Sequence, residues 1–363
     1  MNRIGEKDGK RLAGIALAAL VLLGLCCYWF VVISDPWRLP PRDWALFKKR
    51  FISPQGRVID NGNGDITHSE GQGYGMLIAE AFGDRAAFDK IWRWTRENLQ
   101  TRQDDKLISW LWKPGQDGGG SVADANNASD AEVLVAWALV RASKRWGAYA
   151  YQQAAAEILV DLRRVAVKDT PQGPVLLPGS EGFLKDGGVL LNPSYYIFPA
   201  FGAFSKSFPG GGWDALSKSG LELVEKARFG RWALTPDWVL SGETFSLKTS
   251  FPPDFGYNAI RIPLHLAWRN PKSPLLEPYA NFWKQFPDLS KIPSTVNLET
   301  NAFGTDPALP GMQAIARFVL ACESGTRFTV RDISPVMSDE PYYSASLKLL
   351  TKLAVRESLG GKR

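Results

Sequence analysis

The stretch that decides the fold reads Thr67-His68-Ser69-Glu70-Gly71-Gln72-Gly73-Tyr74-Gly75-Met76. Apolar residues recur at i, i+3, i+4 and i+7 from Tyr74 to Ala81, which predicts an amphipathic helix over about 72–83. The spacing of Thr67 and Glu70 fits a helix capping box. The three glycines weaken the helix and indicate that something bulky approaches it closely. Glu70 therefore has two interpretations, a helix cap or a carboxylate that faces a ligand.

Helical periodicity continues through most of the chain. Strand signals are few and short, at 57–59 and 175–177, and no alternation of strands with helices indicates a doubly wound sheet. Long loops rich in glycine, proline and aspartate separate the helices, and long ordered loops often carry function. The sequence therefore predicts one all-α domain. Its helices are expected near 43–51, 72–83, 85–100, 130–146, 148–167, 194–206, 212–229, 256–269, 275–286, 311–323 and 342–357.

The N-terminal region differs from the rest in composition. Residues 1–11 carry four basic and two acidic side chains, whereas residues 12–34 carry no charge. A run of that length matches the roughly 20 residues that a helix needs to cross a bilayer, and it lacks the small-x-small site of a cleaved signal peptide. We expect 1–11 to stay cytoplasmic, 12–34 to be a transmembrane signal-anchor, 35–42 a linker and 43–363 an exported domain. The alternative is a cleaved signal peptide and a secreted protein.

The composition argues against two classes of function. Lys and Arg total 43 against 37 Asp and Glu, a formal net charge of +6, and no basic run alternates with aromatic residues as on nucleic-acid-binding surfaces. No nucleic-acid partner is expected. The chain has only two histidines and three cysteines, two of them in the apolar N-terminal run. These counts leave no site built from several His or Cys ligands, so neither a metal nor a cofactor is expected.

A second acidic segment runs from Asp124 to Glu132. Ser129 and Glu132 have the spacing of a capping box, the interpretation that we favour for Glu132. Asp130 then falls in the first helical turn, where the helix dipole favours a negative charge. Asp124 and Asn127 lie in a polar loop suited to hydrogen bonds with hydroxyl groups.

A third segment, from Pro252 to Arg261, combines a carboxylate, an amide and a guanidinium. Asp254 fits a helix N-cap, and Arg261 taken alone fits an exposed charge. Any single ring in the aromatic loops fits the core, but together with the acids and amides these rings indicate a groove in which flat rings stack on sugars. The aromatic residues concerned include Trp110, Trp112, Tyr195 and Tyr342.

Taken in order, these motifs resemble glycoside hydrolase family 8 over roughly residues 43–357. The resemblance implies an (α/α)6 barrel that hydrolyses β-1,4 linkages with inversion, using a carboxylic acid and a carboxylate base. It carries the acid onto Glu70 and the signature aspartate, which some family descriptions label a nucleophile, onto Asp130. Inversion needs no nucleophilic residue, so we expect Asp130 to hold and distort the substrate. The matching segments are Ser69 to Met76, Trp110 to Trp112, Ala128 to Ala131, Asn192 to Tyr195, Gly256 to Arg261 and Tyr342-Tyr343.

The chain departs from the family pattern at two positions. Glu132 stands where the signature has a second aspartate, and Asn258 stands where the family has its usual base. An amide cannot accept a proton at neutral pH, so an active enzyme needs another carboxylate as base. Asp254 is the first candidate, because it lies four residues earlier, and Asp130 is the second.

The resemblance is closest to the bacterial cellulases encoded beside cellulose synthase, and it implies an endo-1,4-β-glucanase. The implied partners are a β-1,4-glucan, the inner membrane through residues 12–34 and a cellulose synthase complex, with the catalytic domain in the periplasm. Xylan and chitosan are alternative substrates. A catalytically silent glucan-binding subunit, favoured by Asn258, is the alternative of another class. The residues expected to bind substrate are Trp110, Trp112, Asp124, Asn127, Tyr195, Asn258, Arg261 and Tyr342.

Overall fold

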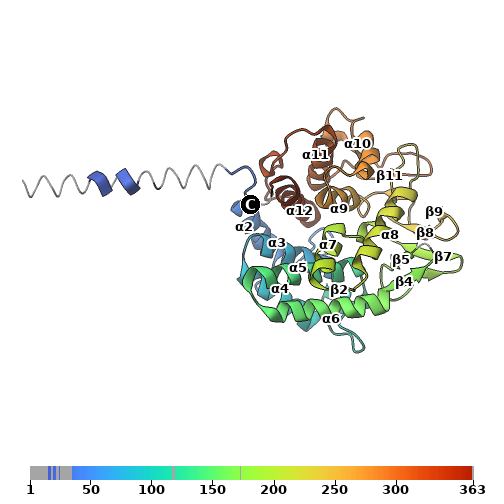
Figure 1. The fold of residues 1–363 in the computed structure, drawn as a ribbon, viewed down its shortest axis with the longest axis horizontal. Helices are drawn as coiled ribbons and strands as arrows, with labels where there is room; N and C mark the ends of the chain where they lie inside the picture. Colours follow the sequence, from blue (N-terminus) through green and yellow to red (C-terminus); the bar gives the residue numbers. More distant parts are fainter. Residues whose placement is uncertain are drawn as a thin grey trace, which may run out of the picture.

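The computed structural model describes residues 15–17, 19–21, 24, 35–116, 119–171 and 173–361, and Figure 1 shows the fold. Each of the eleven helices expected from periodicity is present in this described part of the chain. They are α2 (Pro41–Phe51), α3 (Ser69–Ala81), α4 (Arg85–Asn98), α5 (Ser129–Trp146), α6 (Tyr149–Ala166), α7 (Phe198–Ser207), α8 (Trp213–Lys226), α9 (Arg261–Arg269), α10 (Glu277–Trp283), α11 (Pro310–Ser324) and α12 (Tyr342–Leu359). Short 3-10 helices are η2 (Pro193–Tyr195), η3 (Pro274–Leu276), η4 (Leu289–Lys291) and η5 (Val330–Asp332).

Within the described residues, a ring of helices encloses the core. Helix α3 contacts α5, α5 contacts α7, α7 contacts α9, α9 contacts α12, and α12 returns to α3. Other long helices pack outside this ring: α4 on α3, α6 on α5, α8 on α7, and α11 on both α9 and α12. In Figure 1 the ring helices lie towards the middle of the domain, with α4, α6, α10 and α11 nearer its margin. The arrangement is an α/α barrel, so the prediction of an all-α barrel is confirmed at that level.

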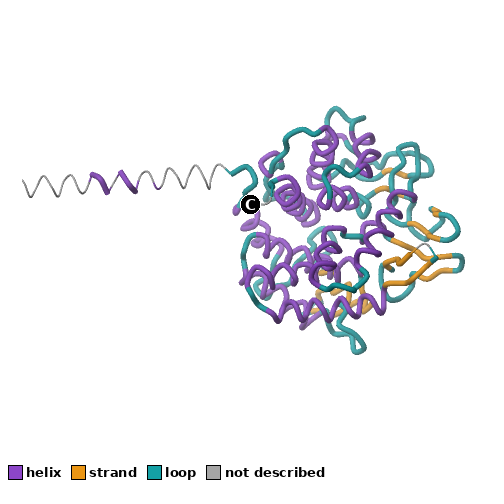
Figure 2. Tube along the Cα trace, in the orientation of Figure 1, coloured by secondary structure: helices purple, strands orange, loops and turns teal. Residues whose placement is uncertain are grey.

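The strands are short and lie in the loops between helices. In the three-stranded sheet, His68 pairs with Leu111 and Trp112 pairs with Val122. Figure 2 shows that most of the strands gather at one side of the helices. The hairpins at 109–127 and 184–191 lie where loops were expected, because their polar and glycine-rich sequences lack an alternating apolar pattern. The antiparallel sheets are β1 (Thr67–His68) with β2 (Ser109–Pro114) and β3 (Gly120–Asn127); β4 (Val167–Thr170) with β5 (Gly173–Leu176); β6 (Leu184–Lys185), β7 (Gly188–Leu191), β8 (Val239–Ser241) and β9 (Phe245–Ser246); and β10 (Asp254–Phe255) with β11 (Val296–Asn297).

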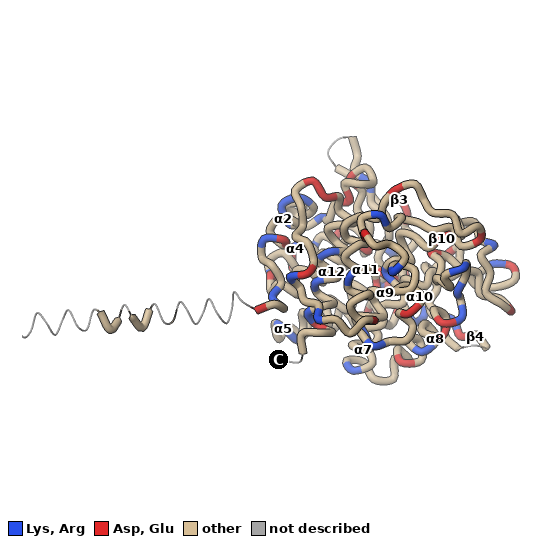
Figure 3. Tube along the Cα trace, turned by 90° about the horizontal axis from the view of Figure 1, so that it is seen from above, with Lys and Arg blue, Asp and Glu red and all other residues tan. Residues whose placement is uncertain are grey.

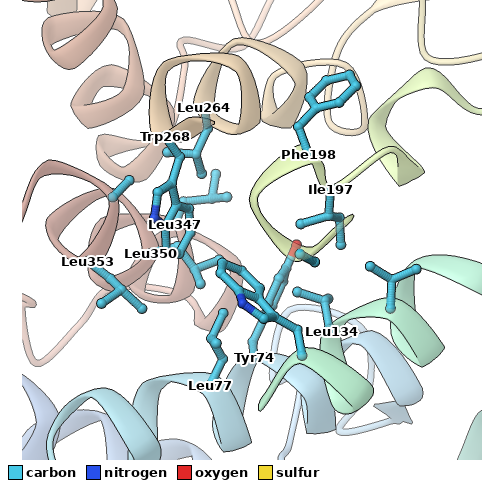
Figure 4. Packing of buried hydrophobic residues seen from close by; sticks show 14 of the residues in the cluster. Tyr74, Leu77, Leu134, Ile197, Phe198, Leu264, Trp268, Leu347, Leu350 and Leu353 are labelled. Carbon is cyan, nitrogen blue, oxygen red and sulfur yellow. The ribbon is translucent and has the colours of Figure 1, made fainter. Parts of the chain in front are cut away.

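Apolar side chains from the ring helices fill the interior of the barrel. A Cβ added at Gly73 would lie 2.6 Å from the Cβ of Leu134, and one at Gly75 would lie 2.8 Å from a methyl group of Val58. The bulky group that approaches these glycines is therefore the protein's own core, not a ligand. Figure 4 shows the packing of Tyr74, Leu77, Leu134, Ile197, Phe198, Leu264, Trp268, Leu347, Leu350 and Leu353, all of them buried.

Residues of both charges are interspersed along the domain, as the colouring of the trace in Figure 3 shows. Neighbours of opposite sign often pair, for example Lys48 with Asp84 at 2.6 Å and Arg102 with Asp105 at 2.8 Å. Partly exposed pairs of this kind contribute about 0–1 kcal/mol each to stability. The cohesion of the domain therefore rests mainly on its apolar interior.

The predicted signal-anchor, residues 12–34, falls mostly outside the described residues. In the part of the chain that the structure covers, no helix is both long and apolar enough to span a membrane. The predicted linker, 35–42, ends inside α2, which begins at Pro41 and has this proline in its first turn.

Candidate active site

Glu70 lies in the first turn of α3, and the residue that caps this helix is His68. The Nδ1 of His68 accepts a hydrogen bond from the backbone N–H of Gly71 at 3.0 Å. The capping-box interpretation is wrong, because the hydroxyl of Thr67 donates instead to the carbonyl of Val58 at 2.7 Å. Glu70 is thus not needed as a cap, and its partly exposed side chain lines a cleft.

The cleft has a volume of about 530 Å³ and opens over the N-terminal ends of several barrel helices. The starts of α3, α5, α9 and α12 each contribute residues to its wall. Helix N-termini carry a partial positive charge, which suits a site that collects carboxylates and polar ligands. The lining residues are Asp60, Gly62, Asn63, Ile66, His68, Ser69, Glu70, Trp110, Ala128, Asp130, Tyr195, Tyr257, Asn258, Arg261, Leu309, Pro341 and Tyr343.

Arg261, the first residue of α9, connects the acidic groups of the cleft. Its Nη1 forms ion pairs with Glu70 and with Asp130, the latter at 3.2 Å to Oδ2, and also donates to the hydroxyl of Tyr74 at 3.1 Å. Its Nη2 donates to Oδ1 of Asn258 at 2.9 Å. The Tyr74 hydroxyl in turn donates to Oε1 of Glu70 at 2.8 Å. Arg261 is buried, so it is not the exposed charge that its sequence context alone would suggest.

Asp130 lies in the first turn of α5, as predicted, and faces both Arg261 and the cleft. Burial, followed by the charge of Glu132, raises the pKa of Asp130 well above its usual range. Its Oδ1 is buried, with no hydrogen-bond partner among the described residues. An unsatisfied buried polar atom costs about 1–3 kcal/mol.

Glu132 points away from the cleft and anchors the preceding loops. Its Oε1 accepts a hydrogen bond from the backbone N–H of Ile108 at 2.8 Å, and its Oε2 accepts one from Asn127 at 3.0 Å. Burial raises the pKa of Glu132 to about 7. The predicted capping box is wrong here too, because the hydroxyl of Ser129 donates to the carbonyl of Leu177 at 2.6 Å.

Asp237 is a structural support of the site that the sequence analysis missed. Its Oδ1 accepts hydrogen bonds from the backbone N–H groups of Gly256, Asn258 and Ala259 at 3.1, 3.0 and 2.6 Å. Burial raises the pKa of Asp237 to about 6, although these three bonds oppose the shift. The turn that it holds replaces the first residues of the helix expected over 256–269. Asp237 precedes this turn by 19 residues or more, so no local spacing signals its role.

Six of the predicted site residues line the cleft: Glu70, Trp110, Asp130, Tyr195, Asn258 and Arg261. The cleft also contains Asp60, Asn63, Tyr257 and Tyr343, which the sequence analysis did not select. The prediction chose Tyr342 where its neighbour Tyr343 faces the cleft, because the sequence does not reveal the orientation of a helix start. Within the described ranges, no group of three or more His, Cys, Asp and Glu side chains offers a metal site.

The other predicted site residues lie in the framework around the cleft. Trp112 is buried edge-on against another tryptophan, and Asp124 is exposed in β3, where it accepts a backbone hydrogen bond. Asn127 is buried, with its side chain bonded to Glu132. Tyr342 is buried within an aromatic group. Asp254 lies in β10 opposite Asn297, so it occupies a strand instead of a helix cap.

Comparison with known proteins shows relatives over most of the chain. A "probable endoglucanase" of Novacetimonas hansenii is 38% identical over 320 residues, which cover 87% of this chain and 91% of the relative. An endoglucanase of Cellulomonas uda is 36% identical over 298 residues, which cover 80% of this chain and 82% of the relative.

Two solved structures are similar over nearly their whole length. The family 8 endoglucanase Cel10 of Klebsiella pneumoniae has a TM-score of 0.81 at 36% identity, covering 87% of this chain and 99% of that one. The endo-β-1,4-glucanase CMCax of Acetobacter xylinum has a TM-score of 0.78 at 37% identity, covering 89% and 99%. The family model described as "Glycosyl hydrolases family 8" matches residues 20–357. The chain therefore belongs to glycosyl hydrolase family 8.

Proposed function

We propose that this protein is an endo-acting β-1,4-glucanase that cleaves with inversion and uses Glu70 as its general acid. The observation that carries the proposal is the position of Glu70. Its carboxyl group contacts Tyr74 and Arg261 and lines an open cleft. Its relatives at 36–38% identity are endoglucanases. A cleft open to solvent accepts the middle of a polymer, as an endo-acting enzyme requires.

Glu70 and Asp130 share one cationic partner, Arg261. Two carboxylates, Glu70 and Asp130, flank one guanidinium that stays charged. Burial raises the pKa of Asp130 above its usual range, and the shared cation couples the titration of the two carboxyl groups. In the proposed reaction the protonated Glu70 side chain donates its proton to the glycosidic oxygen as the bond to the anomeric carbon breaks, while a second carboxylate activates water.

Aromatic rings along the cleft suit the flat faces of pyranose rings. Trp110, Tyr195, Tyr257 and Tyr343 all line it, and the Tyr257 ring lies 6.1 Å from that of Tyr343. Stacking of this kind combines apolar contact with polar edges that remain available for hydroxyl groups. We propose that these four rings form the sugar-binding surface on either side of Glu70.

The charges of the cleft favour a neutral glucan over chitosan. A chitosan site needs spare carboxylates to face the amino groups. Among the described lining residues the carboxylates are Asp60, Glu70 and Asp130, and the last two already pair with Arg261. We therefore rank β-1,4-glucan first, with xylan and chitosan as the alternatives.

The test measures reducing ends and viscosity together on carboxymethylcellulose, xylan and chitosan, using the soluble domain from residue 35. An endo-acting glucanase should lower the viscosity of carboxymethylcellulose early, when few reducing ends have formed, and should act weakly on the other two polymers. Binding without any cleavage would favour the silent glucan-binding subunit. Faster cleavage of xylan or chitosan would reassign the substrate.

We further propose that residues 12–34 anchor the enzyme in the inner membrane, with the catalytic domain in the periplasm, where it acts during cellulose synthesis. Support comes from the charge-free run of residues 12–34 behind a basic flank. The full-length protein should stay with the membrane fraction and keep its N-terminus. An N-terminus near residue 35 on the mature protein would point instead to a cleaved signal peptide.

A further inference from the structure

The cleft needs a second carboxylate to activate water, and Asn258 cannot fill that role. Asn258 lines the cleft and accepts a hydrogen bond from Arg261 at 2.9 Å, but its amide does not take up a proton near neutral pH. Among the described lining residues, only Asp60 and Asp130 remain as carboxylates beside Glu70. The question is which of these two can act as a base.

Asp130 is poorly suited to the task. Its Oδ2 pairs with Arg261 at 3.2 Å, its Oδ1 is fully buried, and burial raises its pKa above the usual range. With one oxygen held by a guanidinium and the other buried, this carboxyl group has no free oxygen to take a proton from water. Asp130 thus fits the substrate-holding role.

Asp60 is better placed to act as the base. It lies where the loop before α3 turns back on itself, and its side chain remains one-tenth exposed at the cleft. Its carboxylate accepts hydrogen bonds from the backbone N–H of Gly62 at 3.0 Å and from Asn63 at 3.3 Å. Burial alone would raise the pKa of Asp60, but His68 and these bonds outweigh it and hold that pKa below its usual value. Asp60 is therefore ionised at neutral pH.

The ring of His68 sets the spacing between Asp60 and Glu70. Its Nε2 lies 3.6 Å from Oδ2 of Asp60, and its Nδ1 lies 3.7 Å from Oε2 of Glu70. Because Nδ1 accepts from Gly71, the proton of the neutral ring is on Nε2 and faces Asp60. The two carboxylates thus lie on opposite edges of one imidazole ring, which keeps them apart, and inverting enzymes need their acid and base about 6.5–9.5 Å apart.

The Asp60 loop is held rigidly, as a catalytic group requires. Gln72 of α3 accepts a hydrogen bond from the backbone N–H of Val58 at 2.6 Å and donates to Thr95 at 2.8 Å. The backbone of Asp60 also pairs with that of Ile66 at 2.9 Å. The same helix that carries Glu70 therefore fixes the position of Asp60.

We propose that Asp60 is the catalytic base of this enzyme, an assignment that rests on the proposed glucanase function. Asp60 takes a proton from water as the water oxygen bonds to the anomeric carbon. The bond from that carbon to the glycosidic oxygen breaks, and Glu70 gives its proton to the departing oxygen. Asp60 ends protonated and Glu70 ionised, and exchange with solvent restores both.

The experiment compares Asp60→Ala with wild type on carboxymethylcellulose and on 2,4-dinitrophenyl β-cellobioside, with and without sodium azide. Loss of the base should lower activity on both substrates by about 10²-fold or more, because water attack is needed whatever the leaving group. Azide needs no deprotonation, so it should restore turnover of the aryl cellobioside and give α-cellobiosyl azide. Asp65→Asn, which removes an exposed carboxylate from the same loop, should keep wild-type activity.

The outcomes separate this proposal from the proposed function. A wild-type protein that cleaves no polymer contradicts the function itself. If wild type is active, then an active Asp60→Ala, or an inactive but folded Asp60→Ala that azide does not rescue, overturns the assignment of Asp60. Asp254→Asn and Asp254→Ala are tested alongside, since loss of activity with azide rescue there would make Asp254 the base.

Discussion

Helices α3 and α5 begin with the same sequence pattern and use it in opposite ways. Both have a hydroxyl residue followed three positions later by a glutamate. At the start of α3, His68 provides the cap and Glu70 lines the cleft. At the start of α5 no side chain caps the helix, and Glu132 is buried against the N–H of Ile108.

The difference lies in what precedes each helix. Before α3 the chain supplies an imidazole whose Nδ1 satisfies a free backbone N–H, so the carboxylate is available for chemistry. Before α5 the buried N–H of Ile108 needs an acceptor, and Glu132 provides it. A capping motif therefore marks where a helix starts, but the contacts outside the helix decide what its glutamate does.

The largest effect that we expect is a difference in enzymatic activity between variants of Glu70 and Glu132. Glu70→Gln should lower the rate of carboxymethylcellulose cleavage by about 10²–10⁴-fold, because general acid catalysis contributes a rate factor of that size. It should leave the melting temperature nearly unchanged. Glu132→Gln is the matched control on α5 and should retain activity in a reducing-end assay. Similar activity in the two variants would remove the contrast between the helix starts.

A third helix start, that of α9, extends the comparison, since its turn is held from a distance by Asp237. Asp237→Ala leaves three partly buried backbone N–H groups without this acceptor, at a cost of up to about 1–3 kcal/mol each, so we expect a loss of several kcal/mol in the free energy of unfolding. Asp237→Asn keeps an oxygen acceptor and should lose much less. Urea denaturation of both variants measures this, and equal stability of the two would contradict the acceptor role.

The pH dependence of stability tests the burial of Glu132. Its pKa is about 7 in the folded protein against 4.5 for the ordinary group, so folding favours its protonated form. This contribution is fully present below pH 4.5 and is lost as the pH rises through about 7, to a limit of about 3 kcal/mol. Between pH 5 and pH 8, wild type should therefore lose more stability than Glu132→Gln, as measured by urea denaturation. Parallel curves would mean that Glu132 titrates normally.

The smallest effect concerns the contact between α3 and α5. The methyl group of Gly73→Ala would lie 2.6 Å from Cβ of Leu134, and overpacking of this kind costs about 1–3 kcal/mol, partly offset by the better helix propensity of alanine. We expect a net loss of about 1 kcal/mol. Gly202→Ala in α7 is the control, because its methyl group meets open space, and it should gain a little stability in the same thermal melt.

Helix periodicity predicted the fold well because the barrel helices bury their apolar stripes against one another. Prediction failed where a distant residue sets the local conformation. The helix expected from residue 256 starts at Arg261, since Asp237 holds the preceding turn.

In the site, the sequence motifs led to Glu70, Asp130 and Arg261, but not to Asp60. The aspartate sits in a short irregular loop, and only the folding of that loop beside His68 brings it to the cleft. Aromatic residues were hardest to place, because a buried ring and a sugar-stacking ring look the same in sequence. Trp112 is buried while Trp110, two residues earlier, lines the cleft.

The central claim is that Glu70 is the general acid. It is tested most directly by measuring how the cleavage rate of Glu70→Gln depends on the leaving group of the substrate. 2,4-Dinitrophenolate leaves without protonation, so this variant should cleave 2,4-dinitrophenyl β-cellobioside at nearly the wild-type rate while losing about 10²–10⁴-fold on carboxymethylcellulose. Equal losses on both substrates, or full activity on the polymer, would contradict the assignment of Glu70 as the acid.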